Sequence, residues 1–247
     1  MKKIGFIGAY DKTDLIIYIA KLLVENGQKI LVVDSTTLQK TRYTVPCITP
    51  SRSYITTYED IDIAIGFESI QEIRNYTGTE DFNYDMILLD VDNPEAFESL
   101  EMYTSDKNYF VTAFDNYSLK RGLEIIGKTA EKNLMTKILF SRHMAKEEDE
   151  YLNFLSFYYS VKWSKEKIYF PFEVGDQSVI NENQRVSKIK FKNLNLCVPV
   201  IGIIFYFPFY LCLYVTWFFP LLFSFLFVSK DLFPMINRWF SEALATK

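Results

Sequence analysis

A short string near the amino terminus has the residue types and spacing of a phosphate-binding turn. In IGAYDKTD (residues 7–14), Gly8, Lys12 and Thr13 follow the pattern G-x-x-x-K-T. Backbone N–H groups beside such a glycine can wrap phosphate oxygens, a lysine can reach the terminal phosphates, and a threonine hydroxyl can ligate magnesium. The string follows an apolar segment and precedes an amphipathic one, so it predicts a nucleotide-binding loop between a strand and a helix.

Two carboxylates lie where a nucleotide site would need them. Asp34 ends the apolar run KILVVD, and Asp90 ends DMILLD. A carboxylate at the end of a buried strand can hold a magnesium-bound water, so Thr13 and Asp90 are the predicted magnesium ligands, and Asp34 joins the predicted nucleotide site. The alternative is that both aspartates are ordinary strand-end carboxylates that face a loop.

The elements that must position these residues alternate between strand-like and helix-like segments. This alternation predicts an α/β fold with a doubly wound, mostly parallel sheet of six or seven strands, in one domain over residues 1–192. The predicted strands are Lys3–Gly8, Lys29–Asp34, Ile61–Ile65, Asp85–Asp90, Tyr109–Phe114, Met135–Phe140 and Lys167–Phe170. The predicted helices are Thr13–Glu25, Glu68–Tyr76 and Asn116–Glu131, the last capped by Asn116 or Ser118.

Over roughly residues 2–185 the sequence resembles the deviant-Walker P-loop ATPases of the ParA/MinD class. The resemblance rests on GFIGAYDKTDL, KILVVDST, YDMILLDVDNP and VTAFDNYSLKRGLEII, with KILFSRHM at the adenine side and IYFPFEVGDQSV after the last strand. Within the class, the degenerate loop and the overall spacing are most similar to the TadZ/CpaE group of Flp/Tad pilus assembly. The resemblance implies ATP and magnesium as cofactors, a homodimer, and pilus or secretion machinery as partners.

The loop departs from the class pattern K-G-G-x-G-K-T-T. Ile7 stands at the signature lysine, Asp11 at the third glycine and Ser141 at the adenine-contacting asparagine; Ala9 and Asp14 are further departures. Asp11 places a carboxylate beside the expected phosphates. Two like charges about 4 Å apart repel by about 1 kcal/mol in water and about 4 kcal/mol at an effective dielectric of about 20. The loop therefore predicts a pseudo-ATPase in which ATP binding is weak or lost.

Composition and charge exclude several other classes of protein. A net charge of −4 argues against a nucleic-acid partner, and the three cysteines form no C-x-x-C pair. His143 is the only histidine, which leaves a zinc site without ligands, and no G-x-S-x-G string supports a serine hydrolase. The apolar run after Lys3 ends at Asp11, too early for a signal peptide, so the amino-terminal part is expected to be cytosolic.

The carboxyl-terminal part has a different composition. Residues 193–229 contain no charged side chain, and about 20 apolar residues suffice to cross a bilayer as a helix. We therefore expect a membrane segment there, on the cytoplasmic face of the plasma membrane, followed by a short amphipathic tail over residues 230–247. Three prolines leave a kinked span, a re-entrant loop and a hairpin open. A fusion or a shifted reading frame at Asn193 is a further alternative.

These observations favour a membrane-tethered pseudo-ATPase scaffold that resembles TadZ/CpaE proteins and positions pilus or secretion machinery. Two alternatives stay open. One is an active ParA/MinD-type positioning ATPase that uses Lys12, Thr13, Asp34 and Asp90. The other is a membrane-associated regulator unrelated to pili, because the site itself carries no information about a partner.

Overall fold

The computed structural model describes residues 1–47, 51–78, 82–129, 134–141, 146–159, 161–170 and 174–191. The predicted membrane segment (193–229) and amphipathic tail (230–247) lie outside these residues, as does His143. Within the described part of the chain, no helix is both long and apolar enough to cross a membrane.

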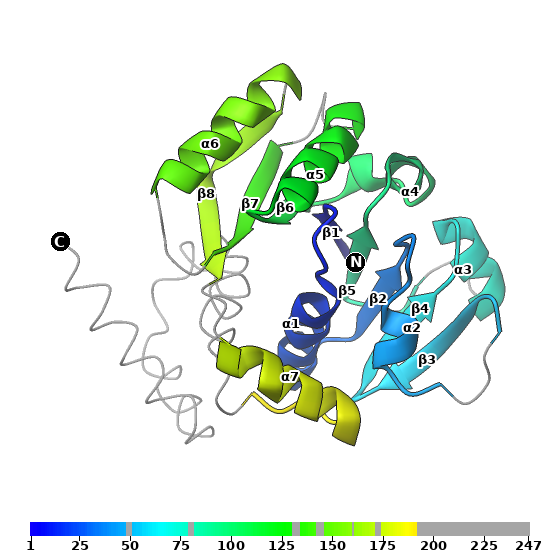
Figure 1. Cartoon of the computed structure of the whole chain (residues 1–247). Helices are drawn as coiled ribbons and strands as arrows, with labels where there is room; N and C mark the ends of the chain where they lie inside the picture. Colours follow the sequence, from blue (N-terminus) through cyan, green and yellow to red (C-terminus); the bar gives the residue numbers. More distant parts are fainter. Residues whose placement is uncertain are drawn as a thin grey trace, which may run out of the picture.

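An eight-stranded sheet in the order β3-β4-β2-β5-β1-β6-β7-β8 forms the centre of the fold (Figure 1). All neighbouring strands run parallel except β3, which pairs antiparallel with β4. The strands are β1 (Lys2–Ile7), β2 (Ile30–Asp34), β3 (Tyr54–Tyr58), β4 (Ile61–Ile65), β5 (Met86–Val91), β6 (Lys107–Ala113), β7 (Leu134–Phe140) and β8 (Lys162–Phe170). The predicted α/β class with a mostly parallel sheet is therefore confirmed.

Helices cover both faces of the sheet. The α-helices are α1 (Thr13–Glu25), α2 (Thr41–Thr44), α3 (Ile70–Thr77), α4 (Pro94–Ser99), α5 (Asn116–Thr129), α6 (Lys146–Ser156) and α7 (Val174–Val186), and the 3₁₀ helices are η1 (Met102–Thr104) and η2 (Phe157–Tyr159). Helices α1 and α7 pack on one face, and α3, α4, α5 and α6 on the other.

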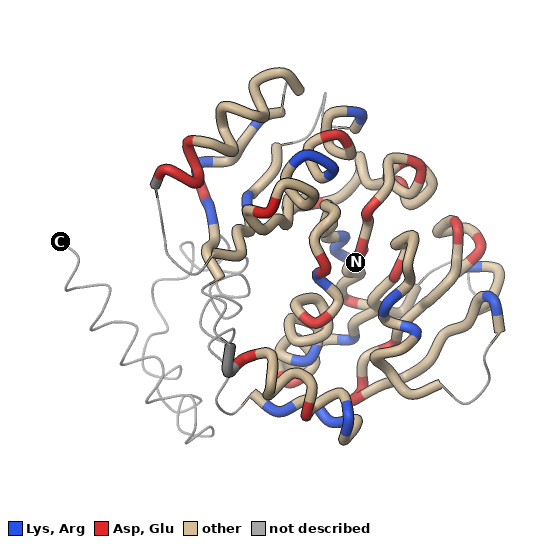
Figure 2. Tube along the Cα trace, viewed as in Figure 1, with Lys and Arg blue, Asp and Glu red and all other residues tan. Residues whose placement is uncertain are grey.

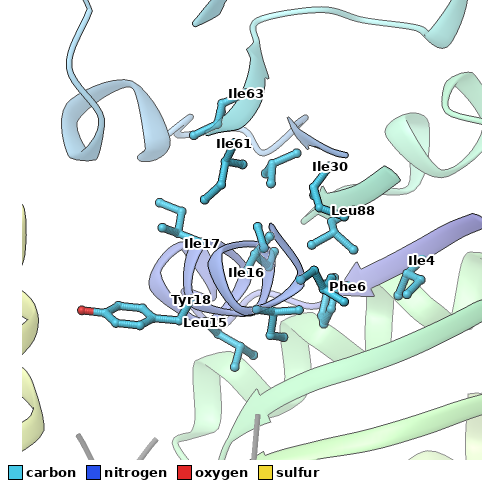
Figure 3. Packing of buried hydrophobic residues seen from close by; sticks show 14 of the residues in the cluster. Ile4, Phe6, Leu15, Ile16, Ile17, Tyr18, Ile30, Ile61, Ile63 and Leu88 are labelled. Atoms are coloured by element: carbon cyan, nitrogen blue, oxygen red, sulfur yellow. The ribbon is translucent and has the colours of Figure 1, made fainter. Parts of the chain in front are cut away.

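Alternate residues of each central strand supply the two cores. Phe6 and Leu88 pack against α1 on one face, as Figure 3 shows, while Ile7 and Leu89 point to the opposite face. A strand that is covered on both faces needs an unbroken apolar run, which is what KILVVD and DMILLD provide. Helix α1 lies at the centre of the first core, and this position fixes the direction of the loop that precedes it.

Three expectations about the elements were wrong in detail. The described residues form eight strands instead of the six or seven predicted, because the edge strand β3 was not predicted. Strand β8 begins five residues before the predicted Lys167. Its first half was not predicted because it carries charged side chains and has no buried residue. The amino-terminal cap of α5 is Asp115, whose Oδ1 accepts the Ser118 N–H at 2.9 Å, rather than Asn116 or Ser118.

Candidate functional site

The loop between β1 and α1 lies at the carboxyl edge of the sheet, where Gly8 lets the chain pass close to β6. The φ angle of Gly8 is +148°, and a Cβ at this position would lie 2.2 Å from the carbonyl oxygen of Val111. The Gly8 N–H donates to the Val91 carbonyl at 3.1 Å. Only glycine fits here, so the predicted turn glycine has a clear physical role.

Lys12 is turned inward, toward the centre of the sheet. Its Nζ lies 2.6 Å from Oδ1 of Asp90 and donates to the Gly8 carbonyl at 3.0 Å. The Lys12 and Asp90 side chains are only 2% and 3% exposed. Burial raises the pKa of Asp90 to about 7, against the opposing effect of the Lys12 ammonium. The ammonium is thus held by the carboxylate that was predicted to serve magnesium.

Asp11 contacts both the loop itself and the segment that follows β2. Its Oδ1 accepts the Thr13 N–H at 3.1 Å, and its Oδ2 accepts from Nζ of Lys40 at 2.8 Å. Partial burial works to raise the pKa of Asp11, but the bonds from Lys40 and Thr13 outweigh it and hold the pKa below its usual value. A carboxylate of this chain therefore occupies a helix-terminal amide that would otherwise be available to an anion.

Asp34 is fully buried and holds the segment that carries Lys40. Its Oδ1 accepts from the N–H and hydroxyl of Thr36 at 3.0 and 2.6 Å, and its Oδ2 accepts the Thr41 N–H at 3.1 Å. Asp34 and Asp90 are partners in the register of β2 and β5, so the two carboxylates lie side by side at the sheet edge. Asp34 therefore organises the backbone that follows β2, as expected of a strand-end carboxylate that faces a loop.

The aromatic ring of Tyr10 links the loop to the far strands of the sheet. It packs against Phe140 with ring centroids 4.7 Å apart, and Phe140 stacks on Phe170 at 5.1 Å. Ser141, at the position that the resemblance assigns to adenine contact, donates its hydroxyl to Glu148 at 2.5 Å. The neighbouring Arg142 lies outside the described residues.

The structure brings all five predicted site residues, Gly8, Lys12, Thr13, Asp34 and Asp90, to one edge of the sheet. Sequence reasoning missed Lys40, which neutralises Asp11, and Asp92, whose Oδ1 accepts from the N–H and hydroxyl of Thr37 at 2.8 and 3.0 Å. Both belong to polar loops without a periodic pattern, so no signal in the sequence distinguishes them from ordinary surface residues.

These contacts do not fit an ATP–magnesium complex. The lysine that should reach the phosphates is buried against Asp90, and a carboxylate lies at the amide of Thr13. The predicted magnesium roles of Thr13 and Asp90 stay predictions, and no step of catalysis follows from this arrangement.

The carboxyl of Asp14, at the start of α1, should make the stability of the protein depend on pH. Burial raises the pKa of Asp14 to about 6, although Gln184 of α7 donates to its Oδ1 at 2.8 Å and opposes the shift. When a carboxyl has a higher pKa in the folded than in the unfolded protein, the folded protein becomes less stable as the pH rises between the two pKa values. We expect Asp14→Asn to gain about 1–2 kcal/mol relative to the parent between about pH 4 and pH 7.

Urea denaturation of both proteins across this pH range measures the difference. The gain should level off above the pKa of Asp14. A difference that does not change with pH would contradict a raised pKa at this position. The asparagine keeps an oxygen that can accept from Gln184, so the comparison isolates the charge.

No protein-family model matches this chain, and no curated protein matches it in sequence. Solved structures do match. A ParA family ATPase from Chlorobium tepidum is 15% identical, with a TM-score of 0.56 over 81% of this chain and 96% of that one. A plasmid partition protein from Borrelia burgdorferi bound to AMPPNP is 11% identical, with a TM-score of 0.54 over 83% and 98%. Apo McdA from Cyanothece is 11% identical, with a TM-score of 0.53 over 82% and 98%. The chain therefore has the P-loop fold of ParA-type ATPases.

Proposed function

We propose that this chain is a ParA-fold scaffold that does not hydrolyse ATP and that positions other proteins at a membrane. The observation that carries the proposal is the buried pair of Lys12 and Asp90, with Nζ and Oδ1 2.6 Å apart. A lysine held in this way is withdrawn from the phosphate-binding loop. The protein then acts through its surfaces and not through turnover.

The energetic argument concerns what a nucleotide would have to displace. To recruit Lys12, ATP must leave the buried Asp90 without its partner; because the pKa of Asp90 is already about 7, the carboxyl can take up a proton, and the cost near neutral pH is about 1–2 kcal/mol. That cost corresponds to a loss of roughly 5- to 30-fold in affinity. The Asp11 carboxylate also occupies the Thr13 amide, and its ion pair with Lys40 at 2.8 Å leaves that amide unavailable to a phosphate.

The proposed tether and the proposed partners rest on the sequence. Residues 193–229 carry no charge and suit a membrane segment, and the basic residues before it, Arg185, Lys188, Lys190 and Lys192, support a location of the fold at the cytoplasmic face of the membrane. The resemblance to TadZ/CpaE proteins makes pilus or secretion machinery the proposed partner and a homodimer the proposed assembly. Accessibility labelling of a cysteine introduced at the carboxyl terminus, in intact cells, tests the topology.

A positioning ATPase is the second candidate. It is favoured by the convergence of Lys12, Thr13, Asp34 and Asp90 at one edge of the sheet and by the AMPPNP bound to the Borrelia burgdorferi neighbour. In this case Lys12 would exchange Asp90 for a phosphate when nucleotide binds. The two candidates differ in one measurable property, the affinity for ATP.

Titration of a fluorescent ATP analogue into the full-length protein in mild detergent, with magnesium, separates the candidates. We expect no binding at micromolar concentrations by the parent, and at least about tenfold tighter binding by Asp11→Gly, because removal of the carboxylate frees the Thr13 amide and Lys40. Asp11→Glu keeps the charge and serves as the matched control. Magnesium-dependent micromolar binding with turnover by the parent would show that it is an ATPase.

A further inference from the structure

Four large aromatic side chains are exposed on one short segment, α6 and the adjoining η2. Tyr151, Phe154, Phe157 and Tyr158 are 44%, 65%, 81% and 79% exposed, respectively. We call these four residues the α6 patch. They lie within eight consecutive positions of a helix that covers the β8 end of the sheet (Figure 1). Contiguous exposed rings of this kind are characteristic of association surfaces.

The fold does not need these rings for its own packing. The inner side of α6 is fixed by the fully buried Leu152 and by Asp149, which pairs with Lys137 at 2.6 Å. In η2, Tyr159 supplies the inward ring, and a Cβ on Gly127 of α5 would lie only 2.3 Å from it. The neighbouring Phe157 and Tyr158 point away and make an edge-to-face pair with each other, with centroids 5.9 Å apart.

Charges of opposite sign lie at the two ends of the α6 patch. Glu147 is exposed in the first turn of α6, and Lys162 is exposed where β8 begins after η2. Figure 2 shows the acidic first turn of α6 and the basic residues of the strand beside it. Strand β8 runs back along α6, because Trp163 donates to Ser156 at 2.9 Å and Lys167 pairs with Asp149 at 2.8 Å, so Lys162 is near the carboxyl end of the helix and Glu147 is at the other end. Glu147 thus lies at one end of the aromatic rings and Lys162 at the other, while Lys167, at the end near Glu147, is already paired with Asp149.

We infer that the α6 patch binds the α6 patch of a second copy of this chain, with the two helices antiparallel about a two-fold axis. In this arrangement each Glu147 faces the partner copy's basic end, and the aromatic rings meet at the centre. A two-fold interface requires a surface that is complementary to itself, and this one is. A basic peptide would match only its acidic end, and an anionic membrane only its basic end.

The area agrees with a weak but specific dimer. At about 200 Å² for each ring, the exposed fractions leave about 500 Å² of aromatic surface on each copy, or about 1,000 Å² in a dimer. Specific interfaces begin at about this size. The surface lies at the β8 end of the sheet, several strands away from the phosphate-binding loop, so the association requires no nucleotide; the inference rests on the homodimer of the proposed function and assigns it a surface.

Sedimentation equilibrium of the full-length protein in mild detergent, with EDTA and without nucleotide, tests the inference. We expect a concentration-dependent dimer whose dissociation constant rises at least about 30-fold in the double variant Phe154→Ser/Phe157→Ser. Tyr43→Ser/Tyr103→Ser removes two rings that are 85% and 59% exposed elsewhere and should leave the dimer unchanged. A monomeric parent, or a dimer that is weakened only by the Tyr43→Ser/Tyr103→Ser control, would overturn the inference.

Charge reversal tests the orientation of the two helices. Glu147→Lys and Lys162→Glu should each weaken the dimer by about 3- to 10-fold, and the combined variant should return to within about threefold of the parent. Circular dichroism spectra confirm that each variant is folded. If the combined variant is as weak as the sum of the single changes, the two ends do not meet and the antiparallel arrangement is wrong.

Discussion

Replacing Lys12 with methionine is expected to lower the free energy of unfolding by about 1–2 kcal/mol at pH 8, where the Asp90 carboxyl is ionised in the parent. The change leaves the Asp90 carboxylate buried without its partner, since both side chains are at most 3% exposed. Lys40→Met is the matched control, because its partner Asp11 is 43% exposed in the ion pair and such pairs contribute about 0–1 kcal/mol. Urea denaturation followed by circular dichroism measures both.

The pH dependence and a second substitution identify the cause of the loss. Burial already raises the pKa of Asp90, and loss of the ammonium raises it further, so the penalty should shrink as the pH falls from 8 to 5 and the carboxyl takes up a proton. The double variant Lys12→Met/Asp90→Leu should recover most of the stability, because an apolar pair of similar volume removes the buried charge. A Lys12→Met protein that is as stable as the parent but has lost ATP binding would show that the lysine serves a nucleotide.

The central strands could be predicted from the sequence because they are buried on both faces. Unbroken apolar runs such as ILVVD and MILLDV are typical of strands that are covered on both faces, and every residue in them is buried. Strand β3 (YITTY) was missed because it lies at the edge of the sheet and its middle is only partly buried. The first half of β8 was missed for the same reason, since KWSKE carries charged side chains and none of its residues is buried.

The position of the candidate site could be predicted, but its internal pairing could not. Parallel strands bring their carboxyl ends to one edge, so the strand ends at Gly8, Asp34 and Asp90 had to converge. Which carboxylate Lys12 contacts depends on the direction of a flexible side chain, and sequence spacing does not determine this. The partner of Asp11 is Lys40, from a loop whose conformation depends on the buried Asp34.

A second cluster of buried charge lies under α6 and had no signal in the sequence. Lys137 of β7 is 4% exposed, and its Nζ lies 2.6 Å from Oδ1 of Asp149 and 2.5 Å from Oδ1 of Asn153. The other carboxylate oxygen of Asp149 accepts from Lys167 of β8 at 2.8 Å. One aspartate in the first turn of α6 therefore fixes the helix to two strands. The run KEEDE predicts a solvated helix start, which describes the exposed Glu147 and Glu150 but not this residue.

Asp149→Asn is expected to lower the free energy of unfolding by about 2–4 kcal/mol at neutral pH, because it leaves the ammonium of Lys137 buried without a charged partner. Partial burial works to raise the pKa of Asp149, but the bonds from Lys137 and Lys167 outweigh it and lower the pKa. The stability that the carboxylate contributes is thus present above the usual carboxyl pKa and is lost as the pH falls below about 4. Urea denaturation should show a constant difference at neutral pH that narrows in acid.

Glu147→Gln, in the same turn but exposed, is the control and should change stability by less than about 0.5 kcal/mol. Equal losses in the two variants would mean that helix-dipole effects, and not the buried pair, hold α6. Because Asp149 anchors the helix that carries the α6 patch, Asp149→Asn should also weaken self-association. Phe154→Ser/Phe157→Ser should weaken self-association while the stability of the fold is unchanged. This difference separates what holds the helix on the sheet from what its outward face binds.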